Sequence, residues 1–199
     1  MQDKFNYIFA LLLLISISAF SRVSAQKSDS LYHLNLDVGI GPSVHLTDID
    51  FEGQQSSQFM GTFRLMWEPE HLLRLGIETG FIHLYYLETK IFDTLFGSTD
   101  VILNMSSVPI MAIFAMEVTE NFEIIGGVGG FIIISEVTSF DNYVLSKSWS
   151  NAYELGISYL HPLNDKLKIG GELKSYYISR LENYDVALQL SIKYSLFSY

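Results

Sequence analysis

The sequence predicts an all-β fold, an eight-stranded antiparallel up-and-down transmembrane β-barrel that follows an N-terminal signal peptide. Three observations support this prediction. Eight stretches alternate between apolar and polar residues, and the connections between them are mostly long and short by turns. Bulky apolar residues share one face of these stretches, and small or polar residues share the other. Charged residues make up 17% of the chain, against roughly 25% in a soluble domain, so a medium other than water is expected to cover part of the surface.

The N-terminal segment is predicted to be a cleaved signal peptide. An apolar run over 8–17 follows Lys4 and precedes a small-residue sequence at 23–25 that is typical of a cleavage site. The alternative is a membrane anchor, but a spanning helix needs roughly 20 apolar residues and this run is shorter. We therefore assign 1–25 to the signal peptide and 26–199 to one outer-membrane β-barrel domain.

The composition narrows the possible partners and sources of stability. The formal net charge is −10, which argues against nucleic acid as a partner, because phosphate binding needs clustered Lys and Arg. The chain has no cysteine. In an exported protein, barrel closure and packing must then supply the stability that disulfides would otherwise provide.

The eight strands are predicted from period-2 patterns that end at polar or turn residues. They cover about 31–46, 57–68, 72–88, 100–117, 121–135, 148–161, 165–180 and 184–197. Short connections are typical of periplasmic turns, and they lie at 68–71, 118–121 and 161–165. Longer acidic connections are typical of outer loops, and they lie at 47–56, 88–99 and 136–147. The last outer connection, 181–183, is short, and the even strand number puts both termini on the periplasmic side.

The size of the side chains predicts which face lies inside. In the last strand, Leu188, Leu190 and Ile192 share one face, and Gln189 and Ser191 share the other. An eight-stranded barrel has an interior just wide enough for side chains, so the face with small and polar residues is expected inside. A secreted lipocalin-like binder would show the reverse, with large apolar residues around a cavity.

Aromatic residues on the apolar face are expected to form belts at the two membrane interfaces, where Tyr and Trp are favoured. The alternative is that they are core aromatics of a sandwich. The residues are Tyr32, Trp67, Tyr85, Trp149, Tyr177 and Tyr194.

The polar face carries charges of both signs in equal number, five basic and five acidic. Because buried ions are costly unless they are paired, this balance predicts a filled, self-neutralising lumen and not an ion path. We assign to this structural charge network Asp37, Arg64, Arg74, Glu78, Glu154, Lys168, Glu172, Lys174 and Lys193, with Glu68 on the same face.

Hairpin geometry suggests how these charges pair. A turn about 182–183 would place Glu172 opposite Lys193, and pairing of the last strand with the first would bring Asp37 to the same lysine. Lys193 would then act as a clasp on the closing seam. Two further neighbour pairs are expected, Glu154 with Lys174 and Arg64 with Glu78.

Two motifs depart from simple strand patterns. Pro109 lies in the middle of a predicted strand and cannot donate a ladder hydrogen bond, so we expect a bulge or bend there. The glycine-rich run at 126–130 is not followed by Lys-Ser or Lys-Thr or by a helix, so it is not a phosphate-binding loop. We expect its glycines to leave room for bulky neighbours.

The order of three motifs resembles a known family. LGIETGF at 75–81, Val-Pro-Ile at 108–110 and FEIIGGVGG at 122–130 are similar to the small eight-stranded outer-membrane β-barrels of the Bacteroidetes, a group that includes PorT-like proteins. That group shares the architecture of OmpX and of the OmpA barrel. The last strand looks like a barrel-assembly signal, although Tyr199 falls on the polar-face parity. The resemblance spans the mature chain and implies the bacterial outer membrane without fixing one activity.

Five histidines are the residues to consider for an enzyme at the outer rim. His33, His71 and His161 fall near predicted periplasmic ends. His45 lies at an outer end, close in sequence to Asp48 and Asp50, and could be a base or metal ligand or simply a histidine at a loop edge. His83 shares the outer half of its strand with residues of the apolar-face parity. We assign no catalytic, cofactor-binding or metal-binding residue.

The sequence therefore predicts a monomeric outer-membrane barrel without a cofactor, surrounded by lipid, which is not an enzyme. Its function would lie in surface interaction or in contact with an envelope, secretion or extracellular protein. The predicted contact segments are the outer loops 47–56, 88–99 and 136–147. Two alternatives remain, an outer-membrane enzyme of lipase or acyltransferase type with rim residues and a secreted lipocalin-like binder.

Overall fold

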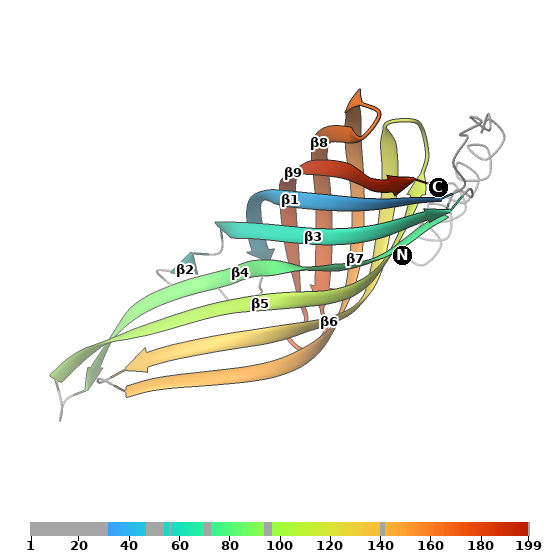
Figure 1. Cartoon of the computed structure of the whole chain (residues 1–199). Coiled ribbons are helices and arrows are strands. Elements are labelled where there is room, and N and C mark those ends of the chain that lie inside the picture. The colour runs from blue at the N-terminus through green and yellow to red at the C-terminus, as the bar shows by residue number, and fades with distance from the viewer. Residues whose placement is uncertain are drawn as a thin grey trace, which may run out of the picture. The chain divides into compact units, whose positions relative to one another are not determined.

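A computed structural model gives the fold of the chain (Figure 1). The residues that it describes are 32–46, 54–55, 57–69, 73–93, 97–139 and 142–198. The predicted signal peptide, 1–25, lies outside these residues. No helix within them is both long and apolar enough to span a membrane.

One antiparallel sheet closes into a ring. Its strands are β1 (Tyr32–Leu46), β2 (Gln54–Gln55), β3 (Ser57–Pro69), β4 (Leu73–Asp93), β5 (Gly97–Glu117), β6 (Phe122–Ser139), β7 (Asn142–Asn164), β8 (Leu167–Ile178) and β9 (Asn183–Ser198). The order is β2-β4-β3-β1-β9-β8-β7-β6-β5, and β5 pairs with β4 to close the ring. Eight long strands therefore form an up-and-down barrel, and the two-residue β2 adds to the edge of β4. Both ends of the barrel domain lie at one rim, where His33 is the register partner of Ser198.

The eight predicted strands are confirmed, but two of the predicted outer loops are wrong. Most of 88–99 belongs to β4 and β5, and most of 136–147 belongs to β6 and β7. These strands are longer than predicted because they continue past the ring as a sheet. Strands outside a closed core do not need a fully buried apolar face, so the sequence shows no clear period-2 pattern there. Of 47–56, only the residues of β2 are described.

The bulky apolar face points outward, as predicted. Leu155, Ile157, Leu188, Leu190 and Ile192 have exposed fractions of 68%, 50%, 62%, 52% and 40%. A lipocalin-like barrel would bury these residues around a cavity. This wall instead presents an apolar surface to its surroundings, as a transmembrane barrel does.

Aromatic pairs mark both margins of the apolar wall. Tyr32 stacks on Trp67 near the rim that carries the ends of the barrel domain, with ring centroids 6.0 Å apart. Tyr177 packs on Tyr184 near the other rim, at 5.1 Å. The prediction for Tyr85 is wrong, because a bulge between His83 and Tyr85 shifts the alternation and turns Tyr85 inward.

The lumen is filled, but it is not uniformly polar. Fourteen buried apolar residues form a cluster that lines much of the interior of β3 to β6 and continues onto β7, β8 and β9. Met60, Ile82, Phe131 and Tyr176 in this cluster are wholly buried. The polar filling is concentrated on β1, β7, β8 and β9, and fewer buried polar residues lie on β3 to β6.

Of the bulge or bend expected at Pro109, the bulge is absent. Pro109 pairs in register with Phe131 of β6, and on the other side the pairing with β4 lapses between Thr79 and Ile82 without a register shift. A register shift in β9 follows Ser195, and it places Phe197 opposite Leu34 on the outward face. The interruption of alternation in the last strand therefore has a backbone cause.

Two adjacent glycines in β6 allow a test of which strand face points into the lumen and which points outward. A Cβ on Gly127 would lie 2.8 Å from Ile113 Cδ1 and 3.1 Å from Glu154 Oε2, whereas a Cβ on Gly126 would have nothing within 4 Å. We expect Gly127→Val to lower the free energy of unfolding by about 1–3 kcal/mol through overpacking. Gly126→Val should be neutral or mildly stabilising, since valine suits an outward strand position. Urea unfolding of the refolded barrel in lipid vesicles measures both, and equal losses would contradict the assignment of faces.

Candidate functional site

A cluster of five charged side chains crosses the middle of the lumen. We call Arg64, Lys174, Glu78, Glu154 and Glu172 the central cluster; each is at most 5% exposed. The residues come from two pairs of neighbouring strands, β3 with β4 and β7 with β8. No strand of one pair is hydrogen-bonded to a strand of the other, so the cluster connects two separate parts of the wall.

Arg64 and Lys174 bind the same carboxylates. Arg64 Nη2 lies 2.5 Å from Glu78 Oε2 and 2.8 Å from Glu172 Oε1. Lys174 Nζ lies 2.9 Å and 3.0 Å from those same two oxygens. The Tyr176 hydroxyl donates a further hydrogen bond to Glu78.

Glu154 is held less firmly. Its Oε1 lies 3.3 Å from Arg64 Nη2 and 3.7 Å from Lys174 Nζ, and its Oε2 has no hydrogen-bond partner among the described residues. The central cluster contains three carboxylates and two cations, so one negative charge has no positive counterpart within it. Glu154 is therefore the carboxylate whose charge is least compensated.

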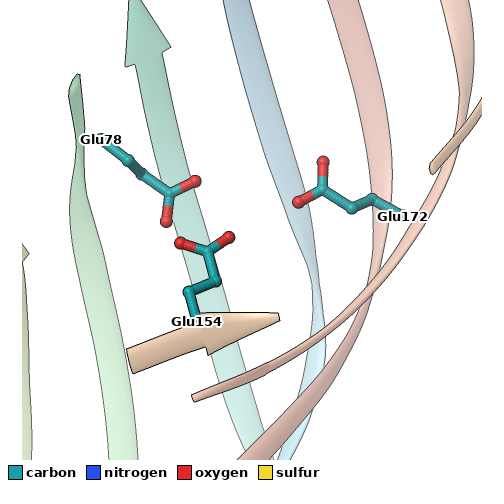
Figure 2. Close-up of side chains that lie close together, drawn as sticks. All are labelled: Glu78, Glu154 and Glu172. Atoms are coloured by element: carbon teal, nitrogen blue, oxygen red, sulfur yellow. The ribbon is translucent and has the colours of Figure 1, made fainter. Parts of the chain in front are cut away.

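Figure 2 shows the carboxylates of Glu78, Glu154 and Glu172 converging inside the barrel. One oxygen from each lies within 4.8 Å of the others, a spacing that could hold a metal ion. Arg64 and Lys174, however, already contact all three carboxylates at this position. A divalent cation there would face two fixed positive charges, so we assign this cluster to internal ion pairing.

A second cluster lies nearer the rim that carries the ends of the barrel domain. Glu123 accepts from Lys193 Nζ at 2.5 Å and lies 2.5 Å from Arg74 Nη2. Arg74 also lies 3.5 Å from Glu68, and both Arg74 and Lys168 approach Glu117, at 3.9 Å and 3.8 Å. We call Arg74, Lys193, Lys168, Glu68, Glu117 and Glu123 the periplasmic cluster.

The predicted clasp is partly wrong. Asp37 is the register partner of Lys193 across the closing seam, as expected. Glu172, however, is opposite Gln189, and the partner of Lys193 on β8 is Lys168. The register differs because the turn, 179–182, is centred about two residues earlier in the chain than the expected turn about 182–183. Lys193 instead reaches Glu123 across the lumen.

The other predicted pairs make contact. Arg64 and Glu78 are direct register partners and not diagonal ones. Glu154 is opposite Tyr176, so its approach to Lys174 is diagonal. Glu123 is not among the predicted charges, although it shares the inward parity of Ile125 and Gly127 in β6, which is the signal that the sequence offers.

A small cavity of about 10 Å³ separates the two clusters. Its lining includes Asp37, Ser158, Glu172 and Lys193. Asp37 Oδ1 and Ser158 Oγ have no hydrogen-bond partner among the described residues. That volume corresponds to about one water molecule, so this part of the lumen is packed and not an open channel.

Beyond the ring, β4 to β7 continue as a four-stranded extension (Figure 1). The β3–β4 pairing ends at Met60 and Ile82, and the β7–β8 pairing ends at Ala152 and Ile178. The strands β4 to β7 remain paired with one another past those points, out to Asp93 and Gly97 in one hairpin. We call this part the outer sheet; it comprises 83–93, 97–106, 134–139 and 142–149.

A polar row crosses the outward face at the base of the outer sheet. His83 Nε2 lies 2.5 Å from Asn104 Oδ1, and the Asn104 amide donates to Glu136 Oε2 at 3.3 Å. These residues come from three neighbouring strands. The row interrupts the apolar outward face of β4, β5 and β6 where these strands leave the ring.

The two histidines of the outer half of the barrel make few polar contacts. His45 has no hydrogen-bond partner among the described residues, and His83 contacts an asparagine.

No family model matches the chain, and no curated protein sequence matches it. The attachment invasion locus protein Ail of Yersinia pestis, solved in complex with the heparin analogue sucrose octasulfate, is 13% identical with a TM-score of 0.54, over 83% of this chain and 99% of Ail. A structure of Ail alone gives 14% identity and a TM-score of 0.51, over 84% and 99%. A major outer membrane protein from Thermus thermophilus gives 11% and 0.53, over 83% and 99%.

These likenesses show a shared fold, the small outer-membrane β-barrel of OmpX-like architecture. The apolar outer wall, with aromatic pairs at both margins, is separate evidence for the same conclusion, because a barrel that spans a membrane has such a surface. Fold and surface together are those of a bacterial outer-membrane protein.

The central cluster predicts unequal effects of two glutamates. We expect Glu172→Gln to cost about 3–5 kcal/mol of unfolding free energy, because Arg64 and Lys174 lose a shared buried carboxylate. Glu154→Gln should cost less than about 1 kcal/mol, since it removes the excess negative charge and a group with longer contacts. Urea titrations in vesicles compare the two, and a larger loss for Glu154→Gln would contradict this account.

The periplasmic cluster predicts which carboxylate is coupled to Lys193. A double-mutant cycle of Lys193→Met with Glu123→Gln should give an interaction energy of about 1–3 kcal/mol. The same cycle with Glu172→Gln should give less than about 0.5 kcal/mol, because these two residues are not bonded. Equal interaction energies in the two cycles would contradict this prediction, because they would mean that Lys193 interacts with Glu123 and Glu172 equally.

Proposed function

We propose that this protein is a non-enzymatic outer-membrane barrel that binds an extended segment of an extracellular or envelope protein along its outer sheet. The observation that carries this proposal is the edge of β7 over 143–149. Beyond Ala152 no described strand pairs with β7 on the side away from β6. A segment of that length can receive another strand through main-chain hydrogen bonds.

The exposed edge lacks the usual protection against strand addition. Its sequence is YVLSKSW, with one charged residue, Lys147, and no proline. Tyr143, Val144 and Leu145 are 60%, 58% and 47% exposed. Edges that must stay unpaired are commonly blocked by charges, proline or bulges, so this edge is suited to a partner.

The inner face of the outer sheet offers side-chain contacts to the same partner. Leu87, Leu103, Val137 and Val144 are successive register partners across the four strands, and so form one apolar row. A strand added beside Val144 would extend this row with its own alternate side chains. Main-chain pairing would supply affinity, and this row would supply selectivity for apolar residues.

The charge of the chain favours a protein partner over a sulfated sugar. Ail is described in complex with a heparin analogue. This chain has a formal net charge of −10, and Lys147 is the one basic residue of the exposed edge. A polyanion would be repelled by the molecule as a whole, whereas an extended polypeptide needs no excess of positive charge.

We also propose that the protein is a monomer. The strands of the ring are all paired, so a single chain leaves no unpaired strand in lipid. The proposal assigns no catalytic residue and no cofactor. The motif order at 75–81, 108–110 and 122–130 supports placement among PorT-like barrels of the Bacteroidetes.

Site-specific photo-crosslinking in intact cells tests the proposal. A photoreactive residue at Val144 should give a protein adduct, because the edge would lie beside the bound segment. Leu163, also in β7 and 57% exposed, is the matched control at the periplasmic end. Leu145→Pro should reduce the Val144 adduct at least tenfold while the barrel stays folded on unboiled gels. Adducts of equal yield at both positions, or none at Val144, would contradict strand addition.

A further inference from the structure

The outer half of the lumen contains a buried histidine and a buried aspartate that face each other. His45 is the next-to-last residue of β1, and Asp185 is the third residue of β9. They are register partners across the seam that joins the first long strand to the last. Both belong to the inward parity, and their exposed fractions are 3% and 0%.

Neither side chain has a polar partner among the described residues. Both ring nitrogens of His45 and both carboxylate oxygens of Asp185 are buried without a hydrogen bond. Buried polar groups are nearly always satisfied, and an isolated carboxylate in an apolar surrounding is especially unfavourable. Two such groups on directly paired positions indicate that something binds between them.

The cations of the lumen do not supply that partner. Arg64 and Lys174 are bound in the central cluster, and Arg74 and Lys193 in the periplasmic cluster. In the described part of the chain, no ion pair involves Asp185. No group among the described residues is therefore left to satisfy the pair, and a bound group that does so must be positive or able to donate.

A third unsatisfied group belongs to the same strand face as His45. Ser43 precedes His45 by two residues on that face, and its hydroxyl also lacks a hydrogen-bond partner among the described residues. Tyr85 stacks on the His45 ring with centroids 5.8 Å apart, which holds the ring in place.

We propose that His45 and Asp185 bind one divalent transition-metal ion of the zinc class at the outer end of the β1–β9 seam. A neutral imidazole nitrogen and a carboxylate oxygen are two of the ligand types that zinc uses, and register partners on paired strands are close enough for one ion to bridge them. Serine oxygen or water would complete the coordination. The site lies within three residues of the strand ends, so an ion can reach it from the outer rim.

A metal accounts for these groups better than a direct bond between them. A hydrogen bond between a neutral His45 ring and Asp185 would leave the negative charge of the buried carboxylate without a counter-ion. A bridging cation would neutralise that carboxylate and bind a ring nitrogen, and water bound to the cation could reach the Ser43 hydroxyl. The ion would also join the first and last long strands at the point where the ring ends.

Metal titration of the untagged barrel, refolded in detergent micelles, tests the proposal. Zn²⁺ added to the protein and followed by calorimetry should bind at one saturable site. Co²⁺ should give a visible absorption band typical of nitrogen and oxygen ligands, which Zn²⁺ displaces. His45→Gln and Asp185→Asn should each weaken Zn²⁺ binding at least tenfold.

The matched control is His83→Gln, which removes an outward-facing histidine and should leave the titration unchanged. Folding of each variant is checked by its shifted mobility on unboiled gels. If a variant does not fold, the wild-type titration and Co²⁺ spectrum still decide the question. Absence of saturable binding to the wild type, or unchanged binding in both His45→Gln and Asp185→Asn, would overturn the proposal.

Discussion

Pairing of β1 with β9 is the constraint on which the rest of the structure depends. In lipid, every backbone donor and acceptor must be paired within the protein, and a sheet achieves this only by closing. Closure with eight long strands leaves an interior just wide enough for side chains. The chain must therefore fill that interior and give its large apolar residues to the outside.

The filling of the lumen changes along its length. In the periplasmic cluster, Glu123 joins Arg74 to Lys193, and in the central cluster Arg64 and Lys174 share Glu78 and Glu172. Most of these ion pairs span strands that are not neighbours in the sheet. The charges therefore hold the circular cross-section, while apolar packing against β3 to β6 fills the remaining volume.

The same four strands cross two environments. From Leu73 to Ile82, β4 is part of the ring, and beyond it β4 belongs to an outer sheet supported by β5, β6 and β7. This arrangement separates the closed ring from the outer sheet, the part that we propose as the surface for a partner. The ring has no edge in the membrane, whereas the outer sheet has an edge at β7 that water can satisfy.

The sequence by itself determined the barrel, its strand number, its outward face and most of its inward charges. These follow from a period of two residues and from side-chain size, both of which are local. Even Glu123, which was not predicted to point inward, shares its parity with Gly127 in the sequence. The direct pairing of Arg64 with Glu78 was also within reach, because those residues flank one short turn.

Only the tertiary structure decided which distant residues meet. The partner of Lys193 depends on where β6 stands across the lumen, and a shift of a few residues in the β8–β9 hairpin replaced Glu172 by Lys168 at its side. One bulge turned Tyr85 from the wall to the interior, beside His45. The pairing of His45 with Asp185 joins the first long strand to the last. Register, bulges and closure are set by the whole ring, since each depends on residues that are far apart in the sequence.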